Sequence, residues 1–318
     1  MKNEDNLFLR LLDDTLNKNV KENIKNNYLK DLKNITKWSC FSDYCFDDKN
    51  KPNDVVTFSL VPYITDYSII ENHIKEIAKT DIKNTKSIQD KFITFLKEYP
   101  LINFSFILND RKEIFGHTHD IRKENVLQQL NLTKDLYSNW IKNQPEKELY
   151  YRKIIKTIDS CISEVKRGKK INIYIDVFLV AFLGAYVSYI ILNELKNIEI
   201  FGWFSDRDKI FDVQNGFIVN IFNNNLHCLL YDKQIPYQFV SSLSNSNFDV
   251  FYDQFIKIPD YIAGTLADYN MIDNLVSKDK FDIMLTKYMG NNTHNNFVFK
   301  IFKEDNQFNC AKISILKK

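Results

Sequence analysis

The run from Val177 to Leu192 is the most apolar part of this chain and the strongest constraint on its fold. It is about sixteen residues long and contains Gly184 and Ser188, with Asp176 at its edge. A helix that crosses a membrane needs roughly 18–20 consecutive apolar residues. We therefore predict a helix buried inside a soluble protein that has no membrane partner.

The composition is typical of a folded protein with reduced thiols. Hydrophobic residues make up 44% of the 318 residues and aromatic residues 14%, which is enough to form a core. Seven Gly and six Pro residues predict a helix-rich chain with few tight turns. The five cysteines include no Cys-x-x-Cys pair, and the first residues lead into no apolar signal segment. We therefore expect a cytoplasmic protein.

Hydrophobic periodicity predicts that strands and helices alternate along the chain. The expected strands are 38–43, 55–61, 101–108, 171–175 and 198–204, with a further candidate at 226–231. The expected helices are 5–34 (one helix or a pair), 68–79, 87–98, 123–166 with a break near Pro145, 178–195, and 258–271 with Pro259 in its first turn. The first two strands are expected to form a hairpin with a long turn.

This order predicts an α/β fold with a mixed sheet flanked by helices. We divide the chain into a helical N-terminal extension (1–36), an α/β domain (37–275) and a C-terminal appendage (276–318). Short strand-like runs such as 297–302 occur within the appendage.

Three aspartates stand at the ends of predicted elements. Asp43 ends the first strand, Asp206 ends the strand that begins near Ile198, and Asp260 opens the helix after Pro259. Three ionised carboxylates cannot lie together unless a cation neutralises them. The pattern therefore predicts a divalent-metal site for Mg²⁺ or Mn²⁺, although each aspartate taken alone is more typical of a turn residue or a helix cap.

Two further aspartates extend this set. Asp206 and Asp208 are two residues apart, so on a strand both side chains would reach one site. Asp260, Gly264 and Asp268 follow i, i+4 and i+8 spacing, which places them on one stripe of a helix. Small residues on that side predict a helix that lies close to the sheet and brings Asp260 to the metal.

Four short motifs resemble those of domain-of-unknown-function family 3800, in the same order along the chain. They are 42–60 (Ser-Asp-Tyr-Cys and the β-branched run that follows), Asp81-Ile82-Lys83, 203–208 (Trp-Phe-Ser-Asp-Arg-Asp) and 258–264 (Ile-Pro-Asp-Tyr-Ile-Ala-Gly). The resemblance spans about residues 38 to 270. It implies an RNase H-like fold and a metal-dependent nuclease.

The resemblance also implies the roles of individual residues. The acidic positions would be Asp43, Asp206 or Asp208, and Asp260, with Asp81 and Lys83 close by. Lys83 could position a scissile phosphate or be a solvated loop residue.

This chain departs from the family at one acidic position. The family has Glu after its first Asp, where this chain has Tyr44, and the family's Gly is missing. Asp47 or Asp48 is the candidate replacement for the missing carboxylate.

Two functions follow from these residues. The first is a metal-dependent nuclease that cleaves DNA or RNA, in a bacterial antiphage or toxin-like system that includes a partner protein. The second is a catalytically inactive subunit that binds a partner protein or nucleic acid. The formal net charge of +2 gives no bulk argument for nucleic-acid binding, so any basic surface must be local.

Overall fold

A seven-stranded mixed sheet forms the centre of the computed structural model, which describes residues 7–17, 20–195, 197–206, 208–231, 236–242, 250–305 and 307–316. The strand order is β5-β4-β1-β2-β3-β6-β7. The strands are β1 (Lys37–Cys45), β2 (Val55–Pro62), β3 (Ile102–Ile107), β4 (Ile200–Ser205), β5 (Gln238–Ser241), β6 (Asn296–Glu304) and β7 (Gln307–Ile313).

β1 has an antiparallel neighbour, β2, on one side and a parallel neighbour, β4, on the other. β1, β2 and β3 form an antiparallel meander, and β4 and β5 continue the sheet parallel to β1. On the other side β6 runs parallel to β3, and β7 runs antiparallel to β6. The predicted α/β class is confirmed. Residues 276–318, set apart as an appendage, supply β6 and β7 to this same sheet.

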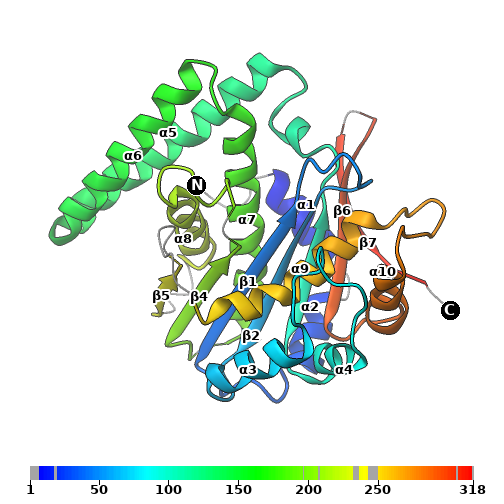
Figure 1. Cartoon of the computed structure of the whole chain (residues 1–318). Helices are drawn as coiled ribbons and strands as arrows, with labels where there is room; N and C mark the ends of the chain where they lie inside the picture. The colour runs from blue at the N-terminus through cyan, green and yellow to red at the C-terminus, as the bar shows by residue number, and fades with distance from the viewer. Residues whose placement is uncertain are drawn as a thin grey trace.

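Helices cover both faces of the sheet (Figure 1). One face carries α3 (Tyr67–Ile77), α4 (Asp90–Glu98), α9 (Tyr252–Asp268) and α10 (Asp279–Met284). The other carries α1 (Leu7–Asn17), α2 (Val20–Asn23), α5 (His119–Asn143), α6 (Glu148–Lys166), α7 (Ile171–Glu194) and α8 (Phe217–Leu229). In Figure 1, α5 and α6 pair as an arm that extends beyond the sheet.

Alternation along β1 decides which face receives each side chain. Trp38 and Cys40 are buried in the core beneath α7 and α8, whereas Phe41 is buried beneath α9. Asp43 follows Phe41 by two residues, so its side chain lies on the α9 face. The position of this carboxylate is thus set by the hydrophobic pattern of the strand.

The predicted buried helix is confirmed as α7, although it is longer than the apolar run that predicted it. α7 is long and apolar enough to cross a membrane, and 89% of its most apolar window is buried inside the protein. Gly184 permits close packing on β2 and α8, because a Cβ atom there would lie 2.8 Å from the ring of Phe58 (β2) and 3.1 Å from that of Phe222 (α8).

Three local predictions were wrong. Residues 171–175 form the first turns of α7, and 226–229 belong to α8 rather than to a strand. α9 begins at Tyr252, so Pro259 and Asp260 lie inside the helix and not at its start. In each case burial against neighbouring elements outweighs the local propensity. β5 was not predicted, because its four residues carry too little pattern.

A buried arginine joins the β1–β2 loop to the other face of the sheet. Arg111 is 2% exposed and pairs with Asp176 of α7 at 2.7 Å (Nε to Oδ1) and with Asp47 at 2.8 Å. It also pairs with Asp54, and its guanidinium lies 4.4 Å from the ring centroid of Phe46. Three of these partners belong to the 46–54 loop, which the arginine therefore holds in place.

We expect Arg111→Met to lower the free energy of unfolding by about 3–5 kcal/mol, because it leaves the buried Asp176 without a partner. Urea denaturation measures this change. The matched control is Arg152→Met, which removes the exposed i,i+4 pair with Glu148 and should cost about 0.5 kcal/mol or less. Equal losses in the two variants would contradict the assigned role of Arg111.

Candidate active site

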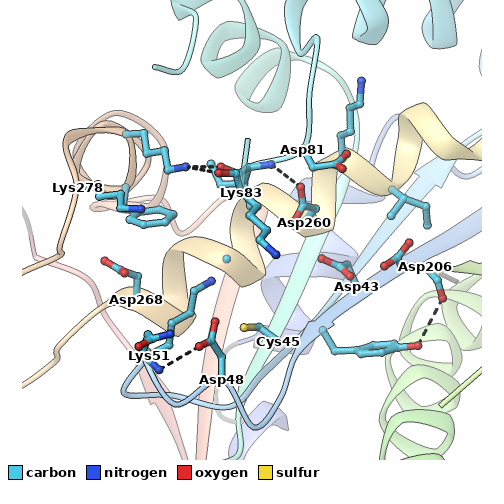
Figure 2. Close-up of a pocket in the computed structure, with 18 of the residues that line it drawn as sticks. Asp43, Cys45, Asp48, Lys51, Asp81, Lys83, Asp206, Asp260, Asp268 and Lys278 are labelled. Carbon is cyan, nitrogen blue, oxygen red and sulfur yellow. Dashed lines mark hydrogen bonds between the residues drawn. The ribbon is translucent and has the colours of Figure 1, made fainter. Parts of the chain in front are cut away.

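Asp43, Asp81, Asp206 and Asp260, four of the five predicted site aspartates, line a cavity of about 870 Å³ on the α9 face of the sheet (Figure 2). Seven aspartates line it: Asp43, Asp48, Asp81, Asp206, Asp253, Asp260 and Asp268. Five lysines line it as well: Lys51, Lys83, Lys257, Lys278 and Lys280. The fold thus brings together acidic residues from strands, loops and a helix that lie far apart in the sequence.

Asp43 and Asp206 are placed by the parallel pairing of β1 with β4. Ser42 of β1 is opposite Ser205 of β4, and the backbone N–H of Asp206 donates to the carbonyl of Ser42 at 3.0 Å. This bond extends the ladder by one residue and sets Asp206 beside Asp43. The side chain of Asp43 is half-buried, and that of Asp206 is exposed.

Asp260 enters the cavity from the middle of α9. Its Oδ2 accepts a hydrogen bond of 2.7 Å from the backbone N–H of Ile82. Asp260, Gly264 and Asp268 all line the cavity, as their helical spacing predicts. At Gly264 the close neighbour is Ile82 and not the sheet, because an added Cβ would lie 2.6 Å from Ile82 Cγ2. The small residue therefore admits the loop after α3.

That loop presents Asp81 and Lys83 to the cavity, and buried groups hold it from behind. Lys257 Nζ donates to the carbonyl of Ala78 at 2.6 Å, and Tyr261 donates to that of Thr80 at 2.8 Å. Lys280 Nζ donates to the carbonyls of residues 82, 83 and 85 at 2.5, 3.2 and 2.9 Å. Lys257 Nζ also donates to Gln254 Oε1 at 2.7 Å, so both ammonium groups already have hydrogen-bond acceptors within the protein.

Sequence reasoning missed these two lysines. Lys257 carried a signal, since it stands within the apolar run of α9, and a buried lysine requires partners. Lys280 carried none, because the carbonyls that it binds come from a loop about two hundred residues earlier.

The close carboxylates perturb one another. Burial raises the pKa of Asp43 well above its usual value, and the neighbouring Asp260 and Asp206 carboxylates raise it further. Burial raises the pKa of Asp260 to about 6, opposed by the hydrogen bond from Ile82. The carboxyl groups of Asp43 and Asp260 also share a hydrogen bond. These two groups therefore titrate as a pair.

The residues do not form a complete metal cage by themselves. In the part of the chain that the structure describes, no three His, Cys, Asp or Glu side chains lie close enough together to hold a metal ion. The donor chemistry nevertheless suits a hard cation, because carboxylate oxygens are the ligands that Mg²⁺ and Mn²⁺ prefer. Two of these carboxylates lie against each other at a cost that a cation would relieve.

The structure separates the candidates that the sequence left open. Asp208 is not among the described residues that line the cavity, and its side chain accepts a hydrogen bond from the backbone N–H of Ile210. Asp47 is paired with Arg111 and Lys112. Asp48 does line the cavity.

Tyr44 cannot take the place of a carboxylate. Its ring is buried on the face opposite α9 and stacks on Phe46, with centroids 5.7 Å apart. Its hydroxyl donates to the backbone carbonyl of Asp206 at 3.5 Å. Asp48 is therefore the described acidic residue of the β1–β2 loop that reaches the site.

Comparison of the chain with protein-family models, with curated proteins and with solved structures gave no match. The resemblance to domain-of-unknown-function family 3800 stays a prediction.

We expect Asp43→Asn to raise the melting temperature of the metal-free protein by roughly 2–6 °C at about pH 8. A carboxyl whose pKa is raised on folding costs stability as the pH rises from its unfolded value, about 3.9, through its folded value. The amide removes that cost. The gain should disappear near pH 4, where the wild-type carboxyl is still protonated in the folded state.

Thermal unfolding in EDTA at the two pH values measures the effect. Asp212→Asn is the control, because Asp212 is exposed and lies outside the cavity lining. A gain of the same size at both pH values would mean that packing, and not charge repulsion, is its cause.

Proposed function

We propose that this protein is a divalent-metal-dependent nuclease with an RNase H-like fold. The observation that carries the proposal is the meeting of Asp43, Asp206 and Asp260 in one cavity, from two adjacent parallel strands and a helix packed across them. Rigid elements of this kind hold catalytic carboxylates in a defined arrangement. The mixed sheet flanked by helices agrees with the resemblance to family 3800.

Asp43, Asp206 and Asp260 would hold Mg²⁺ or Mn²⁺. Asp48 would supply the carboxylate that the family's Glu supplies, at the position where this chain has Tyr44. A divalent cation at such a site activates water and stabilises the leaving oxygen of a phosphodiester. Burial raises the pKa of both Asp43 and Asp260, and the two carboxyl groups share a hydrogen bond. They would exchange their shared proton for the cation.

Lys83 would orient the phosphate. It lies on the same short loop as Ile82, whose backbone N–H is bonded to Asp260. Lys83 therefore follows directly after the residue whose backbone N–H binds the carboxylate of Asp260. A phosphate bound to Lys83 would be held against the acidic group.

The alternative function is a catalytically inactive subunit that binds a partner protein or nucleic acid. The position of Tyr44 favours it, because this residue replaces the family's Glu and its ring lies on the opposite face of the sheet. An inactive subunit would bind neither Mg²⁺ nor Mn²⁺ at the aspartates.

Metal binding distinguishes these functions directly. We expect Mg²⁺ or Mn²⁺ at about 100 times its Kd to raise the melting temperature of the wild type by about 5 °C relative to EDTA. The shift should vanish in Asp43→Asn and in Asp260→Asn, and it should persist in Asp208→Asn. No shift in the wild type at millimolar metal would favour the inactive subunit.

Cleavage tests the catalytic claim. With labelled single-stranded and duplex DNA and RNA, the wild type should cleave at least one substrate only when metal is added. Asp206→Asn should reduce the rate by about a hundredfold or more, because losing a metal ligand costs at least as much as losing a group that supports one. Asp208→Asn, two residues away, should cleave at close to the wild-type rate. Equal losses in the two variants would overturn the ligand assignment.

A further inference from the structure

Three lysines of the cavity differ from the other two. Lys51 is on the β1–β2 loop, Lys83 on the loop after α3, and Lys278 immediately precedes α10. Figure 2 shows the side chains of Lys51 and Lys83 pointing into the opening beside the aspartates. Three separate loops therefore each contribute one ammonium group to the rim of one cavity.

Among the residues that the structure describes, these three ammonium groups have no acidic partner in a salt bridge. Within the described residues, none of the salt bridges involves them. The described contacts of Lys51 Nζ are with uncharged groups. It forms a hydrogen bond with the thiol of Cys45 and lies 5.9 Å from the ring centroid of Phe281. Lys257 and Lys280, by contrast, are buried and bound to carbonyls. The three rim lysines are therefore available to a ligand.

The charge of the cavity determines when such a ligand can enter. Seven aspartates and five lysines line it, so the metal-free cavity is net negative when all of them are ionised. A polyanion is repelled from such a surface unless cations neutralise the carboxylates. One divalent cation would balance the lining, and a second would make it net positive.

The lining also indicates how a nucleic acid would be recognised. The aromatic residues in the lining are Tyr44 and Phe281, and both rings are buried in the two cores. Stacking of bases requires exposed aromatic faces. Contacts from lysines to phosphates fix the position of a strand but carry no sequence information.

We propose that Lys51, Lys83 and Lys278 bind successive phosphates of a nucleic-acid strand, independently of its sequence, once a divalent cation occupies the aspartates. The proposal rests on the proposed function, which it deepens by naming the substrate class and its binding residues. Binding is separable from cleavage, so each can fail without the other.

The test is fluorescence anisotropy of a short labelled oligonucleotide with the wild-type protein, in EDTA and in Ca²⁺, a hard cation that carboxylates also bind. Electrophoresis of the probe afterwards verifies that it is intact. Three phosphate contacts predict that affinity in constant Ca²⁺ falls about 30-fold between about 50 and 200 mM salt. A homopolymer and a mixed sequence should bind equally, and EDTA should weaken binding at least tenfold.

Single Lys→Gln substitutions assign the contacts. Lys51→Gln, Lys83→Gln and Lys278→Gln should each weaken binding and reduce the 30-fold salt effect to about tenfold. The matched controls are Lys49→Gln, on the β1–β2 loop with Lys51, and Lys86→Gln, on the loop after α3 with Lys83. Both lysines are exposed and do not line the cavity. They should retain the full salt effect.

A single Asp→Asn substitution tests whether the charge of the lining controls binding. Asp206 is exposed and lines the cavity, so Asp206→Asn should strengthen binding in EDTA relative to the wild type while abolishing the response to Ca²⁺. Weaker binding of this variant in EDTA would overturn the charge argument.

Several outcomes would overturn the proposal as a whole: no binding of any oligonucleotide by the wild type, salt effects unchanged by the three rim substitutions, or equal losses in the controls. If the wild type binds as expected but cleaves nothing, the nuclease proposal fails and the binding proposal stands. If the wild type cleaves but the three rim variants bind normally, the binding proposal fails and the nuclease proposal stands.

Discussion

Helix α9 packs across the sheet through a stack of aromatic rings. Phe41 of β1 lies between Phe255 of α9, with ring centroids 4.7 Å apart, and Phe204 of β4, at 5.6 Å. Asp43 follows Phe41 by two residues, and Asp206 follows Phe204 by two residues. Because the rings are fixed against one another, the relative positions of Asp43, Asp206 and Asp260 are fixed as well. The cavity depends on this contact.

The same packing holds like charges together at a cost. Burial raises the pKa of both Asp43 and Asp260, and neighbouring carboxylates raise it further: Asp260 and Asp206 for Asp43, and Asp81 and Asp206 for Asp260. Evolution can retain such an arrangement when a ligand relieves it, since sites of strained charge are where function is found. Structural clusters perturb pKa values too, and the Arg111 cluster is one. There, each carboxylate is matched by a guanidinium nitrogen.

The Arg111 cluster and the cavity share the β1–β2 loop. Arg111 anchors Asp47 and Asp54, while the residues between them carry Asp48 and Lys51 to the cavity. Lys257 and Lys280 anchor the loop of Asp81 and Lys83 in a similar way. Buried cations thus hold the loops, and exposed cations of those loops face the opening. The fold uses lysine for two different purposes within one cavity.

Local pattern was sufficient for the strands that carry the acidic residues and insufficient for the helix that completes the site. β1, β2 and β3 were predictable because apolar residues alternate or run continuously between polar turns. Their pairing followed from the hairpin. The start of α9 was missed, because Pro259 resembles a helix beginning and only burial of Tyr252 and Phe255 shows that the helix starts earlier. Residues 171–175 were likewise assigned to a strand from local pattern, because they contain β-branched residues. They are helical because they pack against distant parts of the chain, which the local pattern does not record.

The sequence by itself determined the face on which Asp43 lies, the burial of α7 and the spacing of Asp260, Gly264 and Asp268, because each follows from a period of two or 3.6 residues along the backbone. Tertiary structure alone decided that Asp48 reaches the cavity while Asp47 and Asp208 do not. It also decided which lysines are buried on carbonyls and which face the opening. Those outcomes depend on how loops separated by up to about two hundred residues meet, and no local period records such a meeting.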